Sequence, residues 1–189
     1  MTLCVAALAV GVTPARAADP QPYVTVIRPT GNADLDTAVR ASSDLLGLQK
    51  THTVSPFALV GRIHNDYARI RSALESFGYY APTIAIQAAI ASKNGATTPQ
   101  DGHDPDLPEW MQAIPASQKM EIIVSITKGP QFRVGSISIV PAKGKPPVKL
   151  DAHETGSLGI RTGDPAIAAN ILKADSQLQP TLAEAGSAL

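Results

Sequence analysis

The chain has 189 residues, which is enough for one or two small domains. Its 16 basic and 16 acidic residues give a formal charge of zero, and no basic block occurs, so nucleic-acid binding has no electrostatic footprint. Aromatic residues make up only 4% of the chain, so any core must be built from Ile, Val, Leu and Ala and will be small.

The first 17 residues are predicted to be a signal peptide. Residues 3–12 form an apolar run of about ten residues, too short to cross a bilayer, and Ala15-Arg16-Ala17 matches a cleavage pattern. No basic residue precedes the run, so we expect the first residue to lie inside a longer signal; a chance apolar start is the alternative. Cys4, the only cysteine, would leave with the signal, so the mature protein is expected to contain neither a disulfide nor a thiolate metal site.

The N-terminal half of the mature chain predicts one strand and two helices. Residues 23–27 read as a β-rich strand, and Asn32 is placed to cap a helix over residues 33–48. Ser55 and Pro56 are typical of a second helix start. Its apolar residues recur at helical spacing and Gly78 supplies a left-handed stop; the apolar face comprises Ile63, Tyr67, Ile70, Leu74 and Phe77.

Two further strands are predicted after this helix. Residues 82–91 alternate in polarity, as do residues 121–128. Residues 92–118 between them are rich in Pro, Gly, Asp, Asn and Gln, and we expect a long, partly disordered loop. The two strands would then be the arms of a hairpin.

The C-terminal part repeats the beginning of this pattern. A strand is predicted over residues 132–140, and Asp164 with Pro165 indicates the start of another helix. The order is β-α-α-β-β, followed by β, a short helix and α. We interpret the second series as an internal repeat that is cut short.

Several motifs together resemble the POTRA (polypeptide-transport-associated) domains of the Omp85 superfamily. Each motif alone is weak, but their order and spacing over residues 22 to 186 are fairly specific. They are Tyr23-Val24-Thr25-Val26 before the Gly31-Asn32 turn, the corner Gly78-Tyr79-Tyr80-Ala81-Pro82 after a long helix, Gly129-Pro130, Phe132-Arg133-Val134-Gly135-Ser136-Ile137, and Gly163-Asp164-Pro165-Ala166.

The resemblance implies an α+β fold of POTRA-like β-α-α-β-β repeats, each a three-stranded mixed sheet with two helices on one face. Residues 22–130 would form the first domain, including the long loop 92–118, and residues 132–189 a partial second domain. That loop is longer than the family pattern. The family also continues into a C-terminal membrane β-barrel, whose strands would be alternating segments of about ten residues. The chain has none, so we expect it to be an N-terminal part of a longer protein.

The resemblance further implies a periplasmic scaffold, the soluble arm of an outer-membrane protein in a Gram-negative bacterium. Its expected partners are unfolded outer-membrane or autotransporter polypeptides and an inner-membrane-anchored partner subunit. In the family pattern the second strand lies at the sheet edge, where it can pair with an extended segment. The edge residues would be Thr83, Ile84, Ala85, Ile86, Gln87 and Ala88, and Tyr79, Tyr80 and Trp110 are weaker candidates for partner contacts.

Other functions have less support. A two-partner secretion transporter would use the same module, and a standalone periplasmic interaction module would have one such domain without a barrel. An enzyme is not expected, because no acid, base and nucleophile come together in a known motif, and we expect no cofactor or metal. His64, Asp66 and Arg69 share one predicted helix, and we place them on its solvent side.

Overall fold

The computed structural model describes residues 20–50, 54–91, 98–139, 147–150 and 152–184. The predicted signal peptide, residues 1–17, lies outside these ranges together with Cys4. None of the helices in the described ranges is long and apolar enough to cross a membrane.

The N-terminal part is an α+β unit built on a mixed sheet, so the predicted α+β fold class is confirmed. The strands lie in the order β1-β4-β2-β3, with β1 parallel to β4 and the other two pairs antiparallel. The sheet therefore has four strands instead of three, because the short β3 adds to the free side of β2. Their bounds are Tyr23–Ile27 for β1, Thr83–Ile90 for β2, Gln100–Asp101 for β3 and Met120–Thr127 for β4.

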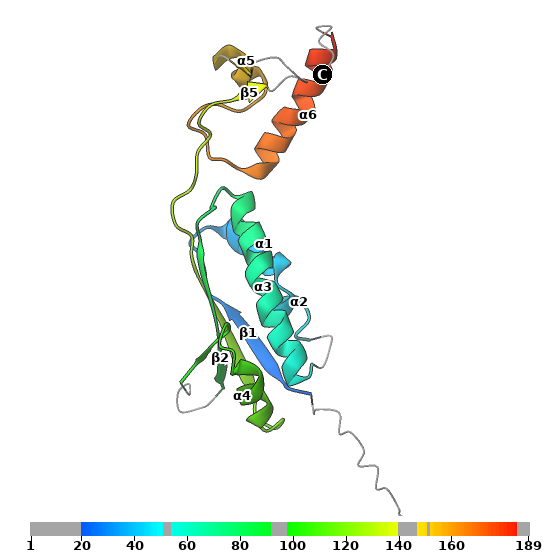
Figure 1. The fold of residues 1–189 in the computed structure, drawn as a ribbon, viewed down its shortest axis with the longest axis vertical. Coiled ribbons are helices and arrows are strands. Elements are labelled where there is room, and N and C mark those ends of the chain that lie inside the picture. Colours follow the sequence, from blue (N-terminus) through cyan, green and yellow to red (C-terminus); the bar gives the residue numbers. More distant parts are fainter. Residues whose placement is uncertain (1–19, 51–53, 92–97, 140–146, 151, 185–189) are drawn as a thin grey trace, which may run out of the picture.

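Helices α1 (Ala33–Ser42), α2 (Asp44–Gly47) and α3 (Pro56–Ser76) cover one face of this sheet (Figure 1). The caps predicted for α1 and α3 are confirmed, since Asn32 accepts from the Leu35 amide and Ser55 from the Ala58 amide. The prediction of a single helix over residues 33–48 is wrong. Ser43 is extended (φ −80°, ψ 119°), ends α1 and caps α2 with its side chain, so the chain turns there.

The core lies between the sheet and the helices. Strand register places its inward side chains in three rows across β1, β4 and β2: Tyr23–Met120–Ile90, Thr25–Ile122–Ala88 and Ile27–Val124–Ile86. The facing side of α3 contributes Leu59, Ile63, Ile70 and Leu74, all of which are fully buried. Alternation in the strands and a 3.6-residue period in α3 thus meet in one apolar layer.

Part of the predicted loop 92–118 is folded. It contains β3 and helix α4 (Leu107–Ala113), while residues 92–97 lie outside the described ranges. Leu107 and Met111 of α4 are buried in the main core. The loop prediction failed here because two apolar residues four positions apart were outweighed by the polar composition around them.

The C-terminal part has its own small core. Its elements are β5 (Ser138–Ile139), β6 (Val148–Lys149), α5 (Ala152–Ser157) and α6 (Ala168–Glu184). Within residues 132–139, the predicted strand 132–140 is reduced to β5 and an isolated bridge between Arg133 and Pro165, and residue 140 lies outside the described ranges. This bridge holds Pro165 outside the helix, so α6 begins later than the Asp164-Pro165 signal indicated. The second core contains Leu158, Ile160 and Ala174. That these elements form a second POTRA-like repeat stays a prediction.

Candidate interaction edge

The outer side of β2, facing away from β4, is the candidate site. The Ile86 carbonyl accepts from the Gly102 amide at 2.7 Å on this side. In an antiparallel ladder, successive residues direct their backbone groups to opposite sides. The N–H and C=O groups of Ile84 and Ala88 therefore point the same way as those of Ile86.

Strand β3 occupies one half of this edge. Gln100 lies opposite Ala88, and Asp101 lies opposite Gln87. The bond from Gly102 to Ile86 continues this ladder by one more residue. We call residues 100–103 the covering segment.

Tyr67 of α3 completes the ladder at Ile86. Its hydroxyl accepts from the Ile86 amide at 3.2 Å and lies 3.4 Å from the Ile86 carbonyl, to which it donates. A tyrosine hydroxyl is protonated at neutral pH and can donate and accept together, and burial raises the pKa of Tyr67 further. A helix side chain thus takes the amide that a paired strand would otherwise bind.

Two histidines hold the covering segment against α3. The Nε2 atom of His64 is 3.1 Å from the Gly102 carbonyl oxygen. The His103 ring stacks on the Tyr67 ring with 3.9 Å between centroids, and it lies 6.4 Å from the His64 ring. The sequence spacing does not indicate that His103 contacts α3, because the turn after β3 brings His103 and Tyr67 together.

Gly102 allows this close approach. A Cβ atom at this position would lie 2.8 Å from both the Ile86 carbonyl oxygen and the Tyr67 hydroxyl, and 2.9 Å from a methyl of Ile63. Any side chain here would push the covering segment away from β2.

The predicted edge residues are therefore not equivalent. Ile86, Gln87 and Ala88 face Tyr67 or the covering segment on their outer side. Within the described part of the chain, β3 pairs with Gln87 and Ala88, and Gly102 bonds to Ile86. The residues nearer the start of β2, which are Thr83, Ile84 and Ala85, lie past the end of this pairing. The open stretch is centred on Ile84, whose backbone groups point outward.

The opposite edge of the sheet, along β1, is covered by other groups. The Thr25 amide donates to Oε1 of Gln49 at 2.9 Å, and the Thr25 hydroxyl donates to the Leu45 carbonyl at 3.1 Å. Just before β1, the Gln21 amide donates to the Val54 carbonyl at 2.8 Å. Side chains and loops around α2 thus lie where an added strand would pair.

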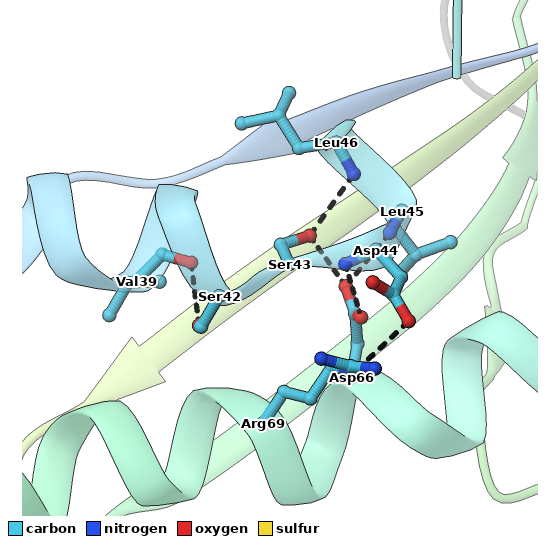
Figure 2. Close-up of polar contacts among 8 residues, drawn as sticks. All are labelled: Val39, Ser42, Ser43, Asp44, Leu45, Leu46, Asp66 and Arg69. Carbon is cyan, nitrogen blue, oxygen red and sulfur yellow. Dashed lines mark hydrogen bonds and ion pairs between the residues drawn. The ribbon is translucent and has the colours of Figure 1, made fainter. Parts of the chain in front are cut away.

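Asp66 positions α2 for this role (Figure 2). Its carboxylate accepts from the Ser43 hydroxyl at 2.5 Å, the Asp44 amide at 2.8 Å and the Leu45 amide at 3.2 Å. The side chain is fully buried, and loss of solvation raises its pKa despite these three donors. Together with the Ser43 hydroxyl, which accepts from Leu46, it satisfies the free amides at the start of α2.

The prediction that Asp66 lies on the solvent side of its helix is wrong. It lies three residues after Ile63 and four before Ile70, which places it on the apolar face of α3. That spacing was the signal in the sequence from which the burial of Asp66 could have been predicted. Arg69, by contrast, is half exposed and pairs with Asp44 at 2.9 Å (Figure 2). Such an exposed pair contributes little to stability.

The weaker candidates for partner contacts each touch other parts of the chain. Tyr79 is buried, with the Lys128 ammonium 5.4 Å from its ring centroid. Tyr80 is 43% exposed and meets the Phe132 ring edge-on at 5.4 Å. Trp110 of α4 is half-buried against the main core. A role in partner binding stays a prediction for all three.

Comparison with known proteins adds no relative. No protein-family model, curated protein sequence or solved structure matches this chain. The class defined by its own geometry is an α+β domain with a mixed sheet, one covered edge and one partly open edge.

Proposed function

We propose that this chain is a binding module that pairs the open part of β2 with an extended segment of another polypeptide. The observation that carries this proposal is the outward direction of the Ile84 backbone groups, beyond the reach of β3 and Gly102. Backbone groups of this kind bind a strand without reading its sequence, since side chains alternate away from the hydrogen bonds.

The wider role that we propose is a periplasmic scaffold for outer-membrane protein assembly. Support comes from the resemblance to POTRA domains, nearest to those of TamA, the outer-membrane subunit of the translocation and assembly module. Sequence-tolerant pairing suits a domain that meets many unfolded outer-membrane or autotransporter chains. An inner-membrane-anchored subunit resembling TamB is the second proposed partner, and the two-partner secretion transporter remains the alternative within the superfamily.

Replacing Ile84 tests the edge directly. Ile84→Pro removes the outward N–H but no bond to β4, and proline is tolerated where the N–H of an edge strand faces solvent. Ile84→Ala is the matched control, because it also loses the side chain but keeps the N–H. The probe is a fluorescent, urea-unfolded outer-membrane β-barrel polypeptide diluted into buffer, and binding is followed by anisotropy.

We expect Ile84→Pro to weaken binding by about tenfold relative to Ile84→Ala, as loss of an edge hydrogen bond and a clash with the paired strand predict. Thermal melts of the two variants should agree closely. Equal binding by both variants would overturn the proposed pairing.

A further inference from the structure

The covering segment lies where an added strand would pair with β2. It already supplies three consecutive positions of an antiparallel ladder, with Gln100 opposite Ala88, Asp101 opposite Gln87, and Gly102 bonded to Ile86. We propose that this segment is an autoinhibitory strand, which competes with an extended partner for β2. This inference rests on the proposed function of the edge.

The partly covered edge offers very little to a partner. With the covering segment in place, an incoming strand can reach the N–H and C=O of Ile84 but not those of Ala88 or the carbonyl of Ile86. One hydrogen-bonded residue pair holds a strand only weakly, since even complete two-stranded hairpins are marginal in water. Displacement of the covering segment would uncover the backbone groups of Ala88 and free the Ile86 carbonyl from Gly102, which leaves only the longer bond from the Tyr67 hydroxyl on that carbonyl and so lengthens the available ladder.

The covering segment is held weakly compared with the helix that follows it. Strand β3 has two residues, and His64 and His103, which fix it to α3, are both exposed. Helix α4, in contrast, is anchored by the buried side chains of Leu107 and Met111. Because the two parts are held so differently, the covering segment can leave β2 while α4 stays in the core.

A disulfide tests whether the covering segment must move. Gln87 and Asp101 lie directly opposite each other on the solvent-facing side, at a pair that is not hydrogen-bonded, where strands approach most closely. The double variant Gln87→Cys with Asp101→Cys, in a Cys4→Ser background, can therefore be locked by oxidation. The same protein after reduction is its own control.

A second variant releases the segment. Gly102→Val places side-chain atoms against the Ile86 carbonyl, the Tyr67 hydroxyl and Ile63, which should force the turn away. Gly135→Val is the matched control, because a Cβ there meets nothing within 4 Å. The probe is a fluorescent peptide with the sequence of residues 119–128, which contains the strand that pairs antiparallel with β2 in this fold.

We expect Gly102→Val to bind the peptide about tenfold more tightly than Gly135→Val, and the oxidised disulfide variant about tenfold more weakly than its reduced form. Hydrogen exchange at the Ala88 amide should be faster in Gly102→Val, which shows that the edge is uncovered. Equal binding by all forms would overturn autoinhibition but leave the edge as a binding site. Absence of binding by any form, with the Ala88 amide uncovered, would overturn the proposed function and autoinhibition together.

Discussion

The hydroxyl of Tyr67 lies 3.2 Å from the amide nitrogen of Ile86, so a helix side chain takes the position of a strand acceptor. Tyr67 and Ile86 are on different layers of the fold, and their contact joins α3 to the outer edge of β2. The bond also lies beneath His103, whose ring stacks on the tyrosine. One side chain therefore supports both the sheet edge and the segment that covers it.

Tyr67→Phe should lower the free energy of unfolding by about 1–2 kcal/mol, because the Ile86 amide loses its partner while the ring stack is kept. Tyr80→Phe is the control. The Tyr80 hydroxyl is 3.4 Å from the Ala166 carbonyl and exposed, so its loss should cost less than about 0.5 kcal/mol. Urea denaturation of both variants measures the difference. Equal costs would contradict the role assigned to Tyr67.

Asp66→Ala should destabilise the N-terminal part by about 3 kcal/mol, because it leaves buried donors of Ser43, Asp44 and Leu45 without an acceptor. Arg69→Ala removes the neighbouring ion pair with Asp44. The Arg69 side chain is half exposed, so this loss should cost less than about 1 kcal/mol. Urea denaturation again measures both. A cost for Asp66→Ala no larger than that for Arg69→Ala would show that the amides of α2 find other partners.

The stability of the protein should depend on the protonation of Asp66 with a definite sign. Its pKa is raised above 3.8 in the folded state, chiefly by burial, so folding favours the neutral carboxyl. Stability from this group is therefore fully present below its unfolded pKa and is lost as the pH rises through its folded pKa. The free energy of unfolding of the wild type minus that of Asp66→Asn should fall over this window.

Urea denaturation of both proteins at a series of pH values between about 3 and 7 measures this difference. Asp36 titrates in both proteins and has the opposite sign, because hydrogen bonds from Thr30 lower its pKa. Subtracting the variant from the wild type removes that contribution. A difference that grows as the pH rises would mean that the three donors outweigh burial at Asp66.

Much of the main sheet and its helices could be predicted from local patterns. The caps at Asn32 and Ser55, the left-handed Gly78 and the alternation in β2 and β4 act within a few residues, so they are visible in the sequence. The break between α1 and α2 at Ser43 could not be predicted in this way, because Asp66 stabilises it from 23 residues away. Propensity alone favoured one continuous helix there.

The candidate site was predictable only in part. Alternation identified β2, and the family pattern suggested that it lies at an edge. The covering segment depends on contacts between Gly102 and Ile86 and between His103 and Tyr67, which join distant parts of the chain. In a polar stretch without periodicity, nothing local indicated that two residues would add to a sheet.

Gly78 should be needed for the contact between the N-terminal part and the segment around Ala166, which lies between α5 and α6. It has φ +85°, and a Cβ atom on it would lie 3.2 Å from the Ala166 carbonyl oxygen. Its own carbonyl accepts from the Phe132 amide at 2.8 Å, and the Phe132 carbonyl accepts from the Ala166 amide at 2.9 Å. Three separate parts of the chain thus meet at this glycine.

Gly31 provides the matched control, since it has φ +83° but a Cβ atom on it would meet nothing within 4 Å. Gly31→Ala should therefore show only the cost of a left-handed alanine, about 1–2 kcal/mol. Gly78→Ala should show that cost and also loosen the contact with Ala166, which limited proteolysis would detect as faster cleavage within residues 131–167. If both variants are cleaved there at the same rate, the backbone conformation alone explains Gly78, and its closeness to Ala166 contributes nothing to the joint.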